Sequence, residues 1–429
     1  MRRAYRSTIV HCLADPGEHN ADAAWQCFDD GVLLVEDGKV LEVGDATTLM
    51  PMLAGTAEIH DLTGKVLVPG FIDCHVHFPQ LDIIASYGEQ LLDWLNRYAY
   101  PEEQRFASEQ HAYEVAETFV RELLNHGTTT ALVFGTVHPH SADAIFAAAE
   151  KRKMRLVAGK VLMDSNCPES LRDDPASGDR DSRDLIERWH GKGRLGYAIT
   201  PRFALTSSEQ QLELAGRLAK EYPDVWVHTH LAENMSEVDA IASQFPWSDS
   251  YLGVYDHFGL VRERSVFAHC LYLGEHDRQC MSSNGAAAAF CPSSNFFLGS
   301  GLLDLRALRE AGIRTGLATD VGGGTSLSML RTMSNAYKAL HLQDQSLPPM
   351  RALYLATLGA AEALYLDDHI GNFEAGKEAD FVVLDPSGSS ITERRCAAAE
   401  TIEELLFALI VLGDDRNVAA SYLQGEAAK

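Results

Sequence analysis

The sequence predicts an α/β protein, a (β/α)8 TIM-like barrel with a small β-sandwich domain formed by both termini. Three observations predict this fold. The chain has 429 residues, enough for one large barrel and an appended module. Its middle alternates short apolar runs with helical patterns, and both of its ends are rich in short strands. We therefore expect the sandwich to span 1–65 and 367–429, and the barrel to span 66–366.

The strand pattern of the two ends supports the sandwich. Val32–Glu36 and Val40–Val43 are apolar runs on either side of Asp37-Gly38, a dipeptide typical of a tight hairpin turn. A similar apolar run, Asp380–Asp385, follows a turn-rich stretch near the other end. Strands at both ends around a different middle indicate one β domain assembled from the two termini.

The middle of the chain supplies the strands of the barrel. We interpret its apolar runs as buried strands, namely Thr129–Phe134, Arg155–Leu162, Gly196–Ile199, Val225–His230, Val266–Ala268 and Thr315–Ala318. Helical patterns such as Glu109–Asn125 and Ser208–Glu221 lie between some of them. A doubly wound open sheet is the alternative, but no Gly-x-Gly-x-x-Gly follows the first strand.

Charge and composition exclude several classes of partner and site. The 36 basic and 61 acidic residues leave a formal charge of -25, which repels phosphate backbones and anionic membrane surfaces. The sequence has no long apolar run and no signal-peptide pattern, so we expect a cytoplasmic protein without nucleic acid polymers or membranes as partners. The eight cysteines form no Cys-x-x-Cys pair, which indicates reduced thiols and argues against a cysteine-liganded zinc.

The strongest local motif is an apolar strand that ends in His75-Val76-His77. Alternate residues of a strand point the same way, so both imidazoles face the interior at the carboxyl end of the barrel, where barrel enzymes place their chemistry. Two nitrogen ligands indicate zinc or a similar metal. Taken alone, the motif is equally compatible with a structural role.

Later strand ends strengthen the metal interpretation. Further strands finish in His230, in His269 and in Asp320, and Glu233 follows His230 by three residues. Because the carboxyl ends of parallel strands meet at one end of a barrel, these side chains are expected to converge. His228 shares a strand face with His230, which lies nearer the mouth. We therefore choose His230 as the ligand and expect His228 to be a structural histidine.

With these motifs in place, the chain resembles the guanine deaminases of the amidohydrolase superfamily over nearly its whole length. The run Pro69–His77 is similar to the first-strand signature of the superfamily, and His230, His269 and Asp320 follow in its order. The segments that resemble guanine deaminases more specifically are His75–Gln80, Leu91–Leu95 with Tyr98–Glu102, and Pro201–Phe203. His230–Asn234 and Cys291–Asn295 also resemble other amine-removing relatives.

The resemblance implies a metal site and a reaction. One Zn2+ per chain would be bound by His75, His77, His230 and Asp320 and would hold a reactive water. Zinc lowers the pKa of such water toward neutrality, and the resulting hydroxide can attack C2 of guanine. The products are xanthine and ammonia. The resemblance also implies a homodimer.

Three residues are expected to handle protons and the attacking oxygen. Glu233 is the expected donor to ring nitrogen N3 and the proton shuttle. Asp320 is suited to accept the proton of the water and to pass it toward the departing amine. The resemblance implies that His269 hydrogen-bonds and orients the hydroxide. A structural role or a place as an extra metal ligand are the alternatives for His269.

Purine selection needs donors placed against a flat polar heterocycle. Arg202 can donate to the O6 carbonyl, and Gln80 offers both a donor and an acceptor to ring nitrogen edges. A donor opposite O6 favours guanine over adenine, because an amino group leaves that donor unpaired. Phe203, Leu92 and Trp94 are expected as apolar walls, with ordinary packing as the alternative for each. A surface ion pair is the alternative for Arg202.

Three alternatives stay open. Lys160 ends another apolar run, and some superfamily members use a modified lysine there to bridge two metals. We expect a structural lysine, and a metal count near two per chain would overturn this. A rival substrate is another aminated heterocycle, such as 8-oxoguanine, a pterin or a triazine. A metal-free scaffold is the rival from another class, but the chain keeps all four expected ligands.

Overall fold

The computed structural model describes residues 2–53 and 55–429. Contacts between residues divide the chain into two compact units. The terminal unit comprises Met1–Asp73, Arg121–Thr130 and Ser328–Lys429, and the barrel unit comprises Cys74–Val120 and Ala131–Leu327. The domain boundaries expected from the sequence, 1–65 with 367–429 and 66–366, stay a prediction.

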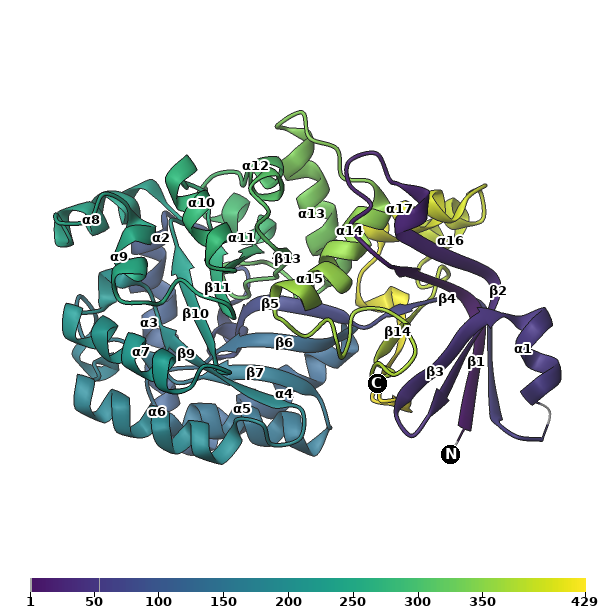
Figure 1. Cartoon of the computed structure of the whole chain (residues 1–429), viewed down its shortest axis with the longest axis horizontal. Helices are drawn as coiled ribbons and strands as arrows, with labels where there is room; N and C mark the ends of the chain where they lie inside the picture. Colours follow the sequence, from purple (N-terminus) through teal and green to yellow (C-terminus); the bar gives the residue numbers. More distant parts are fainter. Residues whose placement is uncertain (1, 54) are drawn as a thin grey trace. The chain divides into compact units, whose positions relative to one another are not determined.

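Strands from both ends of the chain form one sheet in the terminal unit, with the order β16-β15-β14-β4-β1-β2-β3. Figure 1 shows this sheet with both chain ends marked beside it. β14 pairs antiparallel with β4, so the C-terminal strands continue the N-terminal sheet. The predicted β domain from both termini is confirmed. Its strands are β1 (Arg2–Cys12), β2 (Trp25–Glu36), β3 (Lys39–Asp45), β4 (Glu58–Pro69), β14 (Phe381–Leu384), β15 (Val418–Leu423) and β16 (Glu426–Ala427).

The predicted hairpin joins β2 to β3. Asp37 and Gly38 have φ angles of 50° and 81°, the positive values that a two-residue turn of this twist requires. Alternate residues of β2 and β14, such as Leu33 and Val35 or Phe381 and Val383, are buried in one apolar cluster. The helices of this unit are α1 (Ala46–Leu53), α13 (Met329–His341), α14 (Pro349–Ala356), α15 (Leu358–Ala363), α16 (Ser390–Cys396) and α17 (Ile402–Leu412).

Parallel strands form a nearly closed barrel in the order β13-β12-β11-β10-β9-β7-β6-β5, and the short β8 pairs with β9. The Asp320 N–H donates to the His75 carbonyl at 2.9 Å, and the His77 N–H donates to the Val321 carbonyl at 2.8 Å. These bonds join the first strand to the chain that follows the last. The predicted barrel is confirmed. Its strands are β5 (Phe71–His77), β6 (Thr128–Phe134), β7 (Arg155–Gly159), β8 (Val161–Leu162), β9 (Leu195–Pro201), β10 (Trp226–Leu231), β11 (Ser265–His269), β12 (Ala287–Phe290) and β13 (Thr315–Leu317).

Helices connect the barrel strands, and Figure 1 shows α4 to α7 along the outside of β6, β7 and β9. Ser208 caps α7 by accepting the Gln211 N–H at 3.2 Å, which is why this helix begins one residue later than predicted. The helices are α2 (Leu91–Trp94), α3 (Tyr100–Gln104), α4 (Glu109–Asn125), α5 (Pro139–Lys151), α6 (Pro175–Trp189), α7 (Glu209–Glu221), α8 (Met235–Gln244), α9 (Tyr251–His257), α10 (Glu275–Ser283), α11 (Pro292–Phe297) and α12 (Leu305–Glu310).

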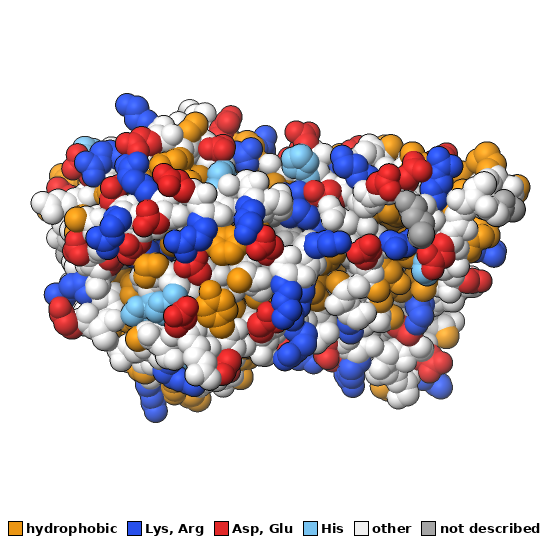
Figure 2. Space-filling model, turned by 90° about the horizontal axis from the view of Figure 1, so that it is seen from below, with side chains coloured by type: hydrophobic (Ala, Val, Ile, Leu, Met, Phe, Trp, Pro, Cys, Tyr) orange, Lys and Arg blue, Asp and Glu red, His pale blue; other side chains and the backbone are white. Residues whose placement is uncertain are grey.

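The surface, the cysteines and the helices add three observations. Acidic and basic side chains are interspersed over the face that Figure 2 presents. All eight cysteines are free. Among the described helices, none is both long enough and apolar enough to cross a membrane.

Candidate active site

Three histidines and an aspartate meet where the barrel strands end. The His75 Nε2 lies 3.1 Å from the Nε2 of His77, which lies 3.2 Å from the Nε2 of His230. The Asp320 Oδ1 lies 3.1 Å from the His75 Nε2 and 3.4 Å from the His77 Nε2. Four donors around a tetrahedral metal, with bonds of about 2.0 to 2.1 Å, lie about 3.3 Å apart. These separations therefore match the spacing of ligands around one metal ion.

The protonation of the histidines also fits a metal. His230 Nδ1–H donates to the Arg202 carbonyl at 2.6 Å, so the Nε2 of the neutral ring presents a lone pair to the cluster. Burial lowers the pKa of His75 and of His230, and it lowers the pKa of His77 to about 3. Neutral imidazole is the form that binds metals. The residues present can therefore hold a metal ion.

His228 lies behind the cluster. Its Nε2 is 2.7 Å from the Nδ1 of His75, and its side chain is fully buried. A metal-ligating histidine usually has a partner on its other ring nitrogen, which orients the ring. The geometry gives His228 this supporting position behind His75.

His269 lies at the same cluster with two roles open to it. Each of four residues offers one potential metal-binding atom, and these atoms all lie within 4.8 Å of one another. The residues are His75, His230, His269 and Asp320. The Nδ1–H of His269 donates to the Asn295 Oδ1 at 3.0 Å, so its Nε2 faces inward. That nitrogen lies 3.3 Å from the Glu233 Oε2. The position suits a group that orients a water as well as it suits a further ligand.

Two buried carboxyl groups at the cluster have opposite proton affinities. Burial raises the pKa of Glu233 well above its usual range, and the charges of Asp320 and Glu237 act in the same direction. Burial also opposes the charge of Asp320. The electrostatic effect of His75 and the hydrogen bonds from His75 and His77 outweigh burial and lower the pKa of Asp320 well below its usual range. A split of this kind allows one carboxyl group to act as an acid and the other as a base.

The backbone is strained at several of these strand ends. Ala232, His269, Cys270 and Asp320 are not glycine, yet their φ angles are 50°, 76°, 58° and 50°. The left-handed region costs a residue with a Cβ about 1 to 2 kcal/mol. Strained residues of this kind cluster at functional sites. No motif in the sequence signals this backbone conformation.

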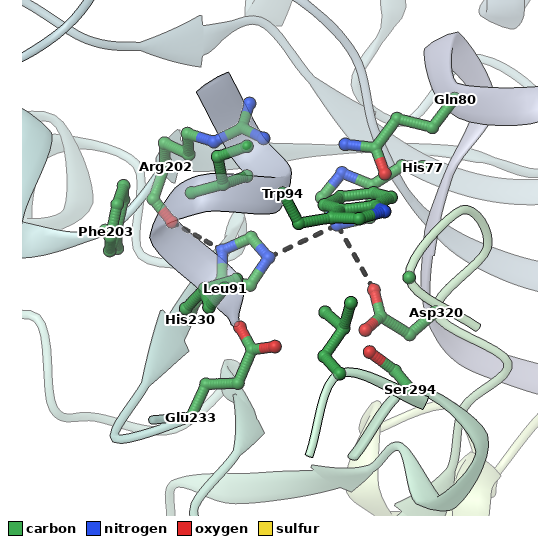
Figure 3. A pocket seen from close by; sticks show the side chains of 13 residues that line it. His77, Gln80, Leu91, Trp94, Arg202, Phe203, His230, Glu233, Ser294 and Asp320 are labelled. Atoms are coloured by element: carbon green, nitrogen blue, oxygen red, sulfur yellow. Dashed lines mark hydrogen bonds and ion pairs between the residues drawn. The ribbon is translucent and has the colours of Figure 1, made fainter. Parts of the chain in front are cut away.

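One cavity adjoins the cluster, and Figure 3 shows its lining. The predicted Gln80, Trp94, Arg202 and Phe203 all line it. The full lining is His77, Gln80, Leu91, Trp94, Leu95, Arg202, Phe203, His230, Glu233, Ser294, Leu298, Asp320 and Gly323.

Leu92 does not belong to this lining, in contrast to the expectation. Leu91, Trp94 and Leu95 are separated by three and four positions and share one helix face, whereas Leu92 lies off that face and is a partly buried residue at the edge of the apolar cluster that these three belong to. The wall from this helix is therefore formed by its neighbours.

Arg202 is buried and paired with Glu103, a residue that no sequence motif predicted as part of the site. It is only 2% exposed, so it is not a surface ion-pair residue. Its Nη1 donates to both carboxylate oxygens of Glu103, at 2.9 and 2.7 Å. The Gln80 Nε2 donates to the same carboxylate at 2.9 Å, and the Arg202 guanidinium lies 5.2 Å from the centre of the Tyr100 ring. A buried arginine requires a carboxylate partner, and this requirement was the available signal.

Two further polar atoms on the lining are open to a ligand. The Trp94 Nε1 and the Ser294 Oγ are buried and have no hydrogen-bond partner in the described parts of the chain. Buried donors are normally paired. A bound ligand can satisfy both.

Lys160 has a partner of its own. It is 1% exposed, donates to the Asp173 carboxylate and donates to the Val161 carbonyl at 3.2 Å. This pairing supports the structural role expected for the lysine.

The comparisons with known proteins agree with this geometry. The amidohydrolase family model matches residues 66–428. The guanine deaminase of Escherichia coli is 47% identical over 403 residues, which cover 94% of this chain and 92% of that protein. The solved structure of the E. coli guanine deaminase has a TM-score of 0.97 at 45% identity, covering 99% of each chain.

A second solved structure is the guanine deaminase from C. acetobutylicum with guanine bound in its active site. It has a TM-score of 0.91 at 27% identity and covers 100% of both chains. The resemblance inferred from the motifs is thereby confirmed. The chain belongs to the amidohydrolase family and, within it, to the guanine deaminases, a group of hydrolytic enzymes.

Proposed function

We propose that this enzyme uses one zinc ion to convert guanine and water into xanthine and ammonia. The observation that carries the proposal is a single cavity that joins the His/Asp cluster, the buried acid Glu233 and the buried donor Arg202. The relatives that share nearly the whole chain are named guanine deaminases, and one of them has been solved with guanine in its active site.

His75, His77, His230 and Asp320 are the proposed ligands. Imidazole nitrogen and carboxylate oxygen in a four-donor set suit zinc. A zinc ion in such a site lowers the pKa of water toward neutrality. His269 is proposed to accept or donate a hydrogen bond to the attacking oxygen, from the inward-facing Nε2.

Asp320 and Glu233 are the proposed proton carriers. The low pKa of Asp320 keeps its carboxylate ionised, and we propose that it accepts the proton of the attacking water because it lies beside the histidines of the cluster. The raised pKa of Glu233 keeps a proton available for N3 while the oxygen adds to C2. The bond between C2 and the amine then breaks, and the proton held by Asp320 leaves with the amine as ammonia. The remaining proton of the added hydroxyl returns to the Glu233 carboxylate, so the new oxygen becomes the C2 carbonyl of xanthine and both carboxyl groups regain their starting state.

We propose that Arg202 and Gln80 recognise the polar edge of the purine. Phe203 and Trp94 are the proposed apolar walls of its pocket. Arg202 donates to the O6 carbonyl, and Gln80 meets the ring nitrogens. A pterin, a triazine or 8-oxoguanine remains the rival substrate, because the same proton chemistry serves any such ring. A homodimer in solution stays a prediction, and light scattering measures it directly.

The test follows guanine loss, xanthine formation and ammonia release, before and after metal removal by a chelator and after zinc is restored. We expect equal amounts of xanthine and ammonia, loss of both with the metal, and recovery with zinc. Metal analysis of the purified protein should give one zinc per chain, and a value near two would contradict the single-metal site. A folded, zinc-loaded sample that does not deaminate guanine would show that guanine is not the substrate.

A further inference from the structure

We propose that Glu103 is the positioning residue that makes the cavity select a purine with an oxo group at C6 over one with an amino group. The proposal rests on the proposed function. Glu103 would act by fixing the orientation of Arg202 and Gln80, the two side chains that face the heterocycle.

Glu103 lies on α3 and is 2% exposed. Its carboxylate accepts from the Arg202 Nη1 with both oxygens and from the Gln80 Nε2 with Oε1. A carboxylate has about four lone-pair sites, so these bonds use most of its capacity. Little of that capacity remains to accept a hydrogen from an amino group of a ligand.

The pairing determines what Arg202 presents to the cavity. The guanidinium is planar, so holding Nη1 against Glu103 fixes the direction of the remaining N–H groups. Its Nη2 and Nε form no hydrogen bond with the described residues, and Arg202 lines the cavity. Burial opposes the charge of Arg202, but Glu103, by its charge and its hydrogen bond, acts together with Tyr100 and Glu233 to raise the pKa, so the side chain stays a pure donor.

The same carboxylate fixes the amide of Gln80. Its Nε2 donates to Glu103, and its Oε1 accepts the Gly322 N–H at 3.1 Å. A flipped amide would place the Gln80 oxygen against the Glu103 carboxylate and the Gln80 NH2 group against the Gly322 N–H. Only one orientation of the amide therefore satisfies both partners. One N–H and one lone pair of Gln80 remain for a ligand.

The consequence is a polar edge dominated by fixed donors. A carbonyl at C6 accepts from the guanidinium, whereas an amino group brings hydrogen atoms against it. Sites with fixed polar partners reject the wrong group strongly, because their buried donors are then left unpaired. Glu103 is therefore expected to affect selectivity through the binding of the purine edge, without touching the reacting atoms.

The test compares guanine with 2,6-diaminopurine, which keeps the amine at C2 but has an amine at C6. Glu103→Gln removes one acceptor oxygen and turns an NH2 group toward Arg202 or Gln80. We expect the ratio of kcat/KM for guanine to that for 2,6-diaminopurine to fall at least about tenfold. The change should come mainly from a higher KM for guanine, with zinc content unchanged. Glu103→Asp keeps the carboxylate and should restore part of the ratio.

Glu102→Gln is the matched control. Glu102 is the adjacent glutamate, and it binds Arg105 at 2.6 Å in place of Arg202. Its substitution should leave the selectivity ratio unchanged. A folded, zinc-containing Glu103→Gln protein with the selectivity of the original would overturn the proposal. If Glu103→Gln does not fold, Glu103→Ala decides, because it removes the carboxylate altogether and an unchanged ratio in a folded Glu103→Ala protein contradicts the assignment.

Binding of hypoxanthine and adenine by calorimetry separates this proposal from the proposed function. A wild-type protein that does not deaminate guanine refutes the function. A preference for hypoxanthine over adenine that disappears in Glu103→Gln would still support Glu103, and a preference that persists would refute it.

Discussion

The core of the terminal sheet and the mouth of the barrel are both buried but contain opposite kinds of side chain. The sheet core packs apolar residues such as Tyr5, Leu33 and Phe381. The mouth buries histidines, acids and Arg202. Apolar burial stabilises by about 25 cal/mol per Å², whereas buried polar groups cost free energy unless they are paired. The difference indicates that the sheet contributes stability and the mouth contributes chemistry.

Backbone conformation follows the same division. Ala232, His269 and Asp320 have positive φ angles at the mouth, whereas the positive φ pair between β2 and β3 belongs to a turn that requires it. Of these two regions, only the mouth of the barrel has strained backbone that is not part of a tight turn. Substitutions at the mouth should therefore lower activity more than stability, and substitutions in the sheet core should lower stability more than activity.

The largest expected effect is at the mouth. Glu233→Gln keeps the shape of the side chain but removes its exchangeable acid proton. We expect kcat for guanine to fall at least about a thousandfold, within the range for loss of a general acid. The free energy of unfolding should not fall, because glutamine keeps the shape of the side chain and removes a buried acid whose raised pKa disfavours folding at neutral pH. Steady-state kinetics and urea unfolding measure the two quantities.

Glu213→Gln, at an exposed position of α7, is the control for this substitution and should change neither quantity. Full activity of Glu233→Gln would remove Glu233 from the mechanism. A large loss of stability would show that the mouth also holds the fold.

The reverse effect is expected in the sheet. Phe381 is fully buried, with its ring 4.4 Å from Tyr422 and 4.8 Å from Tyr5 between centroids. Phe381→Ala should lower the free energy of unfolding by about 3 to 5 kcal/mol, as large-to-small core substitutions do. The kcat of the protein that remains folded should change less than about twofold. Ile391→Ala, at a side chain that is 63% exposed, is the control. A matching loss of kcat in Phe381→Ala would contradict the division between the regions.

A smaller effect concerns His11, a buried titratable group of the terminal unit. Burial lowers its pKa from 6.5 to about 4, and its Nδ1 accepts the Phe373 N–H at 3.4 Å. The unfolded chain binds a proton near pH 6.5 and the folded chain only near pH 4. Stability should therefore fall as pH is lowered through this window, by up to about 3 kcal/mol from this residue.

Urea unfolding of the original protein and of His11→Gln across this pH window measures the contribution. The variant should show the weaker pH dependence, and His19→Gln replaces an exposed histidine as the control. Equal pH dependence of the original and His11→Gln proteins would mean that His11 gains a proton in the folded state as easily as in the unfolded one.

Sequence patterns predicted the fold where local and tertiary preferences agree. The helix Glu109–Asn125 was predicted with its bounds, and the hairpin was predicted with its turn at Asp37-Gly38, although β2 and β3 extend beyond the predicted runs. β12 was missed because Ala287, Ala288 and Ala289 favour helices when taken alone, and only pairing with β11 and β13 makes them a strand. The predicted run Arg155–Leu162 is interrupted at Lys160, whose side chain pairs with Asp173.

The candidate site shows a similar limit. His75, His77, His230 and Asp320 were predictable because each stands at a strand end, and strand ends converge in a barrel. Glu103 was not predictable in this way. It stands next to Glu102 on a helix, and only the folded chain shows that one binds Arg105 while the other binds Arg202, 99 positions away.

Arg202 serves the site through two separate parts of one residue. Its side chain lines the cavity, while its main-chain carbonyl accepts the Nδ1–H of His230. Every amino acid supplies that carbonyl, so a different side chain at this position leaves the support of His230 in place. If Arg202 recognises the purine as proposed, evolution can exchange that group without rebuilding the proposed metal site, which makes position 202 a natural starting point for engineering deaminases of other heterocycles.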